Sequence, residues 1–170
     1  GLMLRSSEEK LLAEYIQGDV IDLASMLEDQ RIQLGITRDR VYRHGIDEII
    51  RPYLGTELIH ERPSTDLFVG LLSMLHKHRG IDAILGSAPE LASASKREGI
   101  PRDDTSFFFI QERPDATYGY VACSQTPTGK QIIKRVNEII RKHRAKGFLD
   151  NYALWLDQTT INWMRGNLPR

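Results

Sequence analysis

The chain has a single cysteine, Cys123, and no long apolar run. One cysteine excludes a disulfide within the chain and leaves the redox compartment undecided. No apolar stretch approaches the roughly 20 residues that span a bilayer. No basic stretch followed by an apolar segment opens the chain, so we expect that a secretion signal is absent or was removed.

The chain also lacks net charge, with 23 Lys and Arg against 23 Asp and Glu. A balanced chain does not carry the basic surface that general nucleic-acid binding needs, so we expect no nucleic-acid partner. Its apolar fraction of 41% and charged fraction of 27% are typical of a globular protein. A length of 170 residues suits one domain or two small lobes with their own core.

Signatures of catalysis and of metal binding are missing as well. The stretch GSAPE, residues 86–90, lacks the GxSxG pattern of a nucleophile elbow, and the sequence contains no P-loop or GxGxxG loop. The five histidines form no HExxH or Cys/His cluster, and His76 and His78, two apart on an expected helix, should point to different sides of it. Cys123 is typical of a small core residue. We therefore predict no enzyme, no metal and no cofactor.

Short apolar runs alternate with amphipathic stretches along the chain. This alternation predicts parallel βαβ units, and hence an α/β fold with a mostly parallel sheet flanked by helices. Asp22 is expected to cap one helix, and Ser64 or Thr65 another. The expected strands are 1–6, 31–37, 56–64, 81–86, 105–112 and 118–124, and the expected helices are 8–17, 22–29, 43–54, 64–80, 90–99, 126–147 and 148–166.

A polar loop joins the strand at 31–37 to the next helix. In open α/β sheets the crevice at the carboxyl ends of the strands binds ligands, and free N–H groups at a helix start favour anions. The spacing fits a ligand site and an ordinary solvated loop equally, so both interpretations stay open. The candidate ligand-binding residues of this loop are Thr37, Arg38, Asp39, Arg40 and Tyr42.

Four segments stand in a specific order along the chain: 22–42 (DLASMLEDQRIQLGITRDRVY), 64–90 (STDLFVGLLSMLHKHRGIDAILGSAPE), 118–143 (YGYVACSQTPTGKQIIKRVNEIIRKH) and 148–157 (FLDNYALWLD). Their order resembles the second lobe and C-terminal segment of type II periplasmic solute-binding proteins, of the family-3 extracellular, amino-acid-type class. The resemblance implies lobe two over residues 1–113. It implies a returning strand and C-terminal helices of lobe one over residues 114–170, with most of lobe one lying ahead of Gly1.

The resemblance also implies ligand contacts. Where the family often has a Gly-Ser-Thr loop that holds a ligand carboxylate, this chain has the charged pair of Asp39 and Arg40. Ser87 stands where amino-acid binders commonly place an Asp or Glu for the ligand ammonium. A hydroxyl cannot neutralise an ammonium, so we expect a ligand other than a standard α-amino acid.

Three further positions match ligand-contacting places in the family. Ser64 and Thr65 match a loop that often touches ligand, although both are equally suited to cap the following helix. Tyr118 matches a residue of the returning strand that can line the cleft, with packing at the hinge as its alternative role. Together with Ser87 and the loop after residue 36, these complete the expected site.

The function that the resemblance implies is that of a periplasmic solute-binding protein, the substrate-binding component of an ABC-type transporter or a fragment of one. It would bind a small polar solute between two lobes and meet a membrane permease or receptor. The alternative is a sensor or interaction domain that keeps the fold without a ligand cleft. Without lobe one, the stripe at 132–140, Trp155 and Trp163 need cover, which re-docking or a homodimer through the C-terminal helices would provide.

Overall fold

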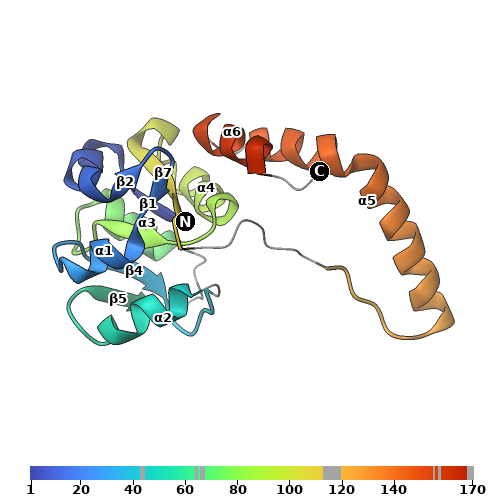
Figure 1. Ribbon diagram of the computed structural model, residues 1–170, viewed down its shortest axis with the longest axis horizontal. Helices are drawn as coiled ribbons and strands as arrows, with labels where there is room; N and C mark the ends of the chain where they lie inside the picture. The colour runs from blue at the N-terminus through green and yellow to red at the C-terminus, as the bar shows by residue number, and fades with distance from the viewer. Residues whose placement is uncertain are drawn as a thin grey trace. The chain divides into compact units, whose positions relative to one another are not determined.

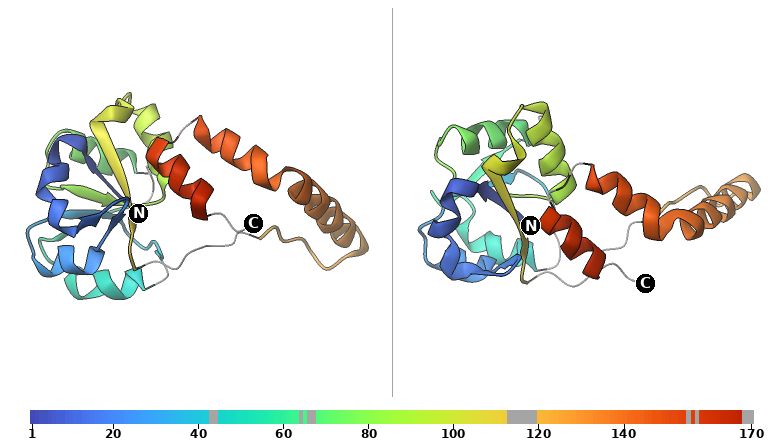
Figure 2. Two further views of the ribbon diagram at one scale, coloured as in Figure 1. Left: turned by 45° about the horizontal axis from the view of Figure 1, so that its top comes forward. Right: turned by 90° about the horizontal axis from the view of Figure 1, so that it is seen from above.

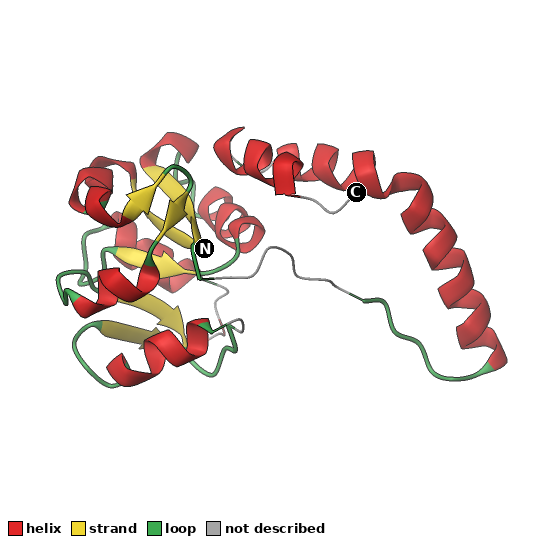
Figure 3. Ribbon diagram, in the orientation of Figure 1, coloured by secondary structure: helices red, strands yellow, loops and turns green. Residues whose placement is uncertain are grey.

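The computed structural model describes residues 1–42, 45–63, 65, 68–112, 120–154, 156 and 158–167. It divides the chain into unit 1, Gly1–Arg113, and unit 2, Pro114–Arg170. Unit 1 holds all the strands that the structure describes, whereas the described part of unit 2 consists of a loop and helices (Figure 3).

Unit 1 is built on a mixed sheet of seven strands in the order β2-β3-β7-β1-β6-β4-β5. Strand β4 pairs in parallel with β5 and β6, and β3 with β7, whereas β1 is antiparallel to both β6 and β7, and β2 to β3. The strands are β1 (Leu2–Arg5), β2 (Ile16–Gln17), β3 (Val20–Ile21), β4 (Leu34–Thr37), β5 (Ile59–Arg62), β6 (Ala83–Leu85) and β7 (Thr105–Ile110).

The α/β class predicted from the sequence is confirmed, but the expected predominance of parallel pairs is wrong. The first strand of the chain, β1, lies between β6 and β7 and runs against both of them. Its apolar residues indicate a buried strand but carry no information on direction. A strand that enters the middle of a sheet in this way turns two central pairings antiparallel.

Helices cover both faces of the sheet, as the two views in Figure 2 show. One face carries α1 (Leu23–Glu28) and α2 (Ile46–Ile50), and the other carries α3 (Val69–His76) and α4 (Ala88–Arg97) (Figure 1). The alternation of side chains along a strand explains the two cores. In β1, Leu2 and Leu4 belong to the cluster that includes α1 and α2, whereas the sulfur of Met3 accepts a hydrogen bond from the Ser95 hydroxyl of α4.

Two segments form a different type of structure from the one that the sequence predicts. Residues 8–17, expected as one α-helix, form the 3₁₀ helices η1 (Ser6–Leu11) and η2 (Ala13–Tyr15), after which β2 begins. The helix stops because Ile16 and Gln17 pair with β3. Residues 120–124, expected within a strand, lie in an exposed loop, and Cys123 is exposed and not in the core. In the described part of unit 2 there is no strand with which this segment could pair.

Unit 2 is dominated by one helix, α5 (Pro127–Ala153), followed by α6 (Gln158–Asn167). Helix α5 continues through Gly147, where the sequence was expected to break it, and the interruption comes after Ala153. A glycine inside a helix costs only about 1 kcal/mol relative to alanine, which strong helix formers on both sides can offset. Among the described residues, we find no helix with the length and apolar character needed to cross a bilayer.

The predicted cap of α1 is confirmed and gives a first test. The Asp22 carboxylate accepts hydrogen bonds from the Ser25 backbone N–H and hydroxyl, each at 2.9 Å. Asp22→Ala should therefore lower the free energy of unfolding by about 1 kcal/mol, as measured by urea denaturation. Asp22→Asn keeps an accepting oxygen and should stay within a few tenths of a kcal/mol of wild type. Equal losses in the two variants would contradict a capping role.

Candidate functional site

The carboxyl ends of β4 and β6 meet at one edge of the sheet. The two strands are parallel neighbours, with Leu34 opposite Ala83 and Gly35 opposite Ile84. The loop at 38–42 leaves β4 at this edge, and α4 starts just beyond β6 with Ser87 at its N-cap. The fold thus brings together two segments that lie almost fifty residues apart in the sequence, as the notion of a crevice at the strand ends requires.

Arg40 is the centre of the side-chain cluster at this edge. Its guanidinium forms a two-point ion pair with Glu90, in which Nη2 donates to Oε2 at 2.6 Å and Nη1 to Oε1 at 3.2 Å. The guanidinium carbon also lies 5.7 Å from the ring centre of Tyr42 and 5.2 Å from that of Phe68. Such a planar fork bound on one side and flanked by aromatic rings is the arrangement in which arginine recognises carboxylates.

Tyr42 holds the loop in shape. Its hydroxyl oxygen accepts a hydrogen bond from the backbone N–H of Thr37 at 2.9 Å, and its own backbone N–H donates to the Asp47 carboxylate at 3.0 Å. Burial raises the pKa of the Tyr42 hydroxyl, and the hydrogen bond from Thr37 lowers it only in part. The hydroxyl is therefore protonated at neutral pH and acts as a fixed support for the loop that carries Arg40.

Ser87 and Glu90 explain why a small neutral residue follows β6. Ser87 is the N-cap of α4 and Glu90 is in its first turn. The two have the S-x-x-E spacing of a capping box, but the Ser87 side chain makes no capping hydrogen bond to the backbone of α4. The Ser87 hydroxyl donates to the Glu90 carboxylate. Burial alone would raise the pKa of Glu90, but the hydrogen bonds from Arg40 and Ser87 outweigh it and hold that pKa below its ordinary value. The carboxylate at this edge is therefore that of Glu90, three residues after Ser87.

A glycine permits this close arrangement. A Cβ atom on Gly86 would lie 3.0 Å from the Leu91 side chain and 3.1 Å from Cε1 of Phe68. Phe68 itself has a backbone φ of +70°, unusual for a bulky residue, and it precedes α3 as its N-cap. The absence of a side chain at Gly86 thus gives Phe68 and α4 the room they need to lie beside the end of β6.

A cavity of about 240 Å³ adjoins the cluster. It shares Phe68 and Glu90 with the surroundings of Arg40 and is large enough for a small organic molecule. Its lining is mixed, with apolar side chains on one part and charged ones on another. The lining residues are Phe68, Pro89, Glu90, Ser93, Ala94 and Arg97.

The structure brings together some of the expected ligand residues and separates others. Arg40 and Ser87 meet at Glu90, and Tyr42 lies under Arg40. Thr37 is buried and contributes a backbone N–H, while Arg38 and Asp39 are exposed. Thr65 is exposed and does not cap α3, which begins at Val69, so that expected cap is wrong. Ser64 and Tyr118 lie outside the described residues.

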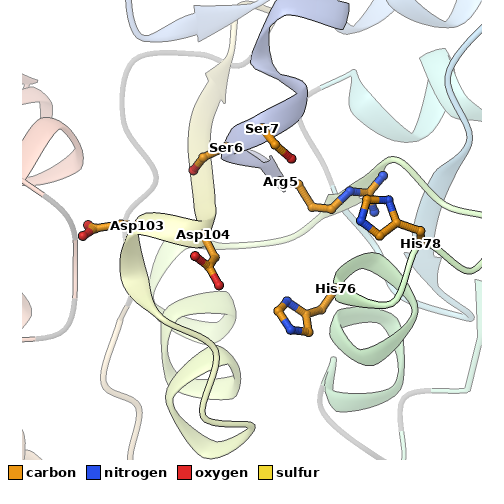
Figure 4. A pocket seen from close by; sticks show the side chains of 7 residues that line it. All are labelled: Arg5, Ser6, Ser7, His76, His78, Asp103 and Asp104. Carbon is orange, nitrogen blue, oxygen red and sulfur yellow. The ribbon is translucent and has the colours of Figure 1, made fainter.

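A second cavity, of about 330 Å³, lies where β1 ends (Figure 4). Its lining corrects the expectation that His76 and His78 point to different sides of a helix. Helix α3 ends at His76, and His78 has a φ of +51°, so both imidazoles border this one cavity. Figure 4 shows them across from Asp104 of η5 (Arg102–Asp104), whereas the Asp103 side chain points away from them. The full lining is Arg5, Ser6, Ser7, His76, His78, Asp103 and Asp104.

Arg5 closes the base of the second cavity and is engaged within the fold. Its Nη1 atom donates to the backbone carbonyls of Leu75 and Ile81, and its Nη2 atom pairs with Glu8. Asp82 lies 3.7 Å away. The guanidinium is thus used to join β1 to the end of α3. Among the residues that the structure describes, no three His, Cys, Asp or Glu side chains are grouped to hold a metal ion.

Comparisons with known proteins found no match from which this site could be identified. Neither a protein-family model, nor a curated protein, nor a solved structure matches the chain. Glu90 and Phe68 are the two side chains of the Arg40 cluster that sequence reasoning missed. The S-x-x-E spacing from Ser87 was a signal for Glu90, whereas nothing in the sequence placed Phe68 beside Arg40.

The Arg40–Glu90 pair predicts a specific pH dependence. A carboxyl group whose pKa is lowered by folding stabilises the fold above its unfolded-state pKa, and this stabilisation is lost as the pH falls through the folded-state pKa. Arg40→Met should raise the pKa of Glu90 and lower stability at pH 7 by up to about 1 kcal/mol, because the pair is partly exposed. The difference from wild type should shrink as the pH falls below the ordinary value of 4.5.

Urea denaturation between pH 3 and about pH 7, with NMR titration of the Glu90 carboxyl, measures both effects. Arg51→Met is the matched control, because Arg51 pairs with the exposed Glu48 of its own helical segment, at 3.6 Å. An unchanged Glu90 titration in Arg40→Met would show that the guanidinium does not hold that carboxylate ionised.

Proposed function

We propose that unit 1 is a ligand-binding lobe of a solute-binding protein, and that it binds a small polar solute through a carboxylate group at Arg40. The observation that carries the proposal is the two-point contact between Arg40 and the Glu90 carboxylate at the carboxyl edge of β4 and β6. Glu90 occupies the position that a solute carboxylate would take, beside a cavity of about 240 Å³.

Binding would proceed by exchange of one carboxylate for another. Without solute, Glu90 neutralises Arg40, so the partly buried cation is not left unpaired. The Glu90 side chain is 42% exposed and can turn aside without opening the core. A solute carboxylate would then take the two guanidinium N–H groups, and Glu90 would be free to receive a positively charged group of the same solute.

In solute-binding proteins of this class two lobes close around the solute, so the solute would also contact a second lobe. A solute held at Arg40 would shift the protein toward a closed form only if it also contacts a second lobe, because closure is driven by the difference in affinity between the open and closed forms. The order of the four sequence segments supports this class. A membrane permease or receptor as partner, and a periplasmic location, follow from the same resemblance and belong to the proposal.

A second candidate is a sensor or interaction domain that keeps the fold without a ligand cleft. The same ion pair favours it: Arg40 already has a carboxylate partner, aromatic neighbours and a half-buried position. In that case the pair simply ties the β4 loop to α4, and the cavity beside it has no occupant. The two candidates differ in whether Arg40 exchanges its partner.

Thermal unfolding against a panel of amino acids, small organic acids and polyamines separates the two functions. A bound solute at a hundred times its dissociation constant should stabilise unit 1 by about 2.7 kcal/mol. Arg40→Ala should abolish the shift, and Arg51→Ala, which removes an exposed arginine elsewhere in unit 1, should preserve it. A panel without any shift would contradict solute binding and favour the interaction domain.

Glu90→Gln tests the exchange itself and identifies the class of solute. The variant removes the competing negative charge, so a solute that carries only carboxylates should bind more tightly, by roughly tenfold if the gain is about 1.4 kcal/mol. A zwitterionic solute should bind more weakly, because it loses the partner for its ammonium group. Calorimetric titration of a solute found in the panel distinguishes the two, and an unchanged affinity would show that Glu90 does not take part.

A further inference from the structure

Helix α5 carries an apolar stripe whose residues are exposed or half-buried. The side chains of Ile132 and Ile139 are 47% and 54% exposed. They recur at the spacing that places residues on one face of a helix, and three further apolar residues widen the stripe. The stripe consists of Ile132, Ile133, Val136, Ile139 and Ile140. An exposed row of this kind marks a docking surface when it is contiguous.

The same helix is strongly basic. Residues 130–146 contain seven Lys or Arg and one Glu, a net charge of +6. At 100° per residue, Arg135 and Lys142 flank the stripe beside Ile139, whereas Lys130, Lys134 and Arg141 fall on the opposite side. The helix is thus amphipathic and positively charged, which favours an occupant with an acidic surface.

Unit 1 contains such a surface. Residues 6–29, which form η1, η2, β2, β3 and α1, contain seven Asp or Glu and one Lys. The flanking Arg5 and Arg31 pair with Glu8, Glu14 and Asp29, which leaves this surface a net charge of −4. Leu11 in this acidic segment is 49% exposed, so the surface also offers apolar contact. The basic helix α5 and this acidic surface are therefore complementary in charge.

We propose that the α5 stripe docks on the acidic segment, residues 6–29, of a second copy of this chain, and that the two copies exchange this contact to form a symmetric dimer. Each copy docks its α5 stripe on the acidic segment of the other, so two copies form a complete assembly and no docking surface is left for a third copy. A pair formed by two α5 helices is disfavoured, because both carry the same charge. The dimer does not depend on the proposed solute site and goes beyond it.

Sedimentation equilibrium of the full chain over a range of concentrations tests the dimer. We expect a mass twice the 19.5 kDa of the single chain at low salt. The dissociation constant should rise by roughly tenfold or more when the ionic strength increases from about 0.05 M to 0.5 M, because salt screens the attraction between the two surfaces. A monomer at every concentration, or a dimer insensitive to salt, would overturn the proposal.

Two variants on α5 separate apolar docking from charge. Ile139→Asp places a carboxylate in the stripe and should raise the dissociation constant at least tenfold. Gln131→Asp adds the same charge on the other side of the helix and should have a much smaller effect. Both side chains are exposed, so neither change disturbs a core. Equal effects would show that the stripe is not in the interface.

A charge exchange identifies the partner surface. Glu9 and Glu28 are exposed in the acidic segment, whereas Glu8 and Glu14 are paired with Arg5 and Arg31. Arg135 and Lys142 stand four residues before and three residues after Ile139, so they lie beside the stripe. Chains with Arg135→Glu and Lys142→Glu should be monomeric, and so should chains with Glu9→Lys and Glu28→Lys. An equimolar mixture should recover a dimer of one chain of each kind, because both reciprocal contacts regain opposite charges. Failure to recover it would overturn the assignment of the acidic segment.

If the wild-type chain remains monomeric but sediments with vesicles of an anionic phospholipid, the stripe binds a membrane surface and the dimer is wrong. Vesicles of neutral phospholipid are the control. The acidic unit 1 argues against that result, since residues 1–113 contain 19 Asp or Glu and 14 Lys or Arg. An anionic surface would repel that unit while attracting the helix.

Discussion

The parallel pairing of β4 and β6 is the constraint on which the candidate site depends. It puts the end of one strand beside the end of another, so the β4 loop and the first turn of α4 share an edge of the sheet. Arg40 and Glu90 then meet across about fifty residues of sequence. Gly86 leaves room beside this pair, because a side chain there would lie 3.0 Å from Leu91 and 3.1 Å from Phe68, and these side chains would have to shift by a few tenths of an ångström. Sheet topology and charge pairing thus support one another at this edge.

The parts of the fold that sequence could predict are those set by local pattern. Apolar alternation identified β4, and the Asp22 cap placed the start of α1. Pattern could not tell that β1 would enter the centre of the sheet antiparallel to its neighbours, because strand direction is decided by the connections around it. It also failed at residues 120–124, where a run with strand-like composition has no described neighbour to pair with.

Part of the candidate site could likewise be predicted from local sequence pattern, whereas the contacts between elements could not. The loop after β4 has recognisable chemistry, and Arg40 and Tyr42 do lie in the cluster. Glu90 could have been anticipated from its spacing to Ser87, but its role as the partner of Arg40 depends on the distance between two elements. His76 and His78 illustrate the opposite error. Their spacing excludes a shared face only while the helix continues, and α3 ends at His76.

The Arg40–Glu90 pair also sets a minimum binding free energy that a solute must reach to displace Glu90 from Arg40. Glu90 is tethered beside Arg40, and a tethered group competes with an effective concentration on the order of millimolar. A solute that offered only a carboxylate would therefore displace Glu90 poorly. It must gain additional contacts, either with the freed Glu90, with the adjoining cavity, or with a second lobe that closes over it. A binding face that carries its own competing anion is well suited to a clamp, because it holds solute tightly only when the other contacts are also made.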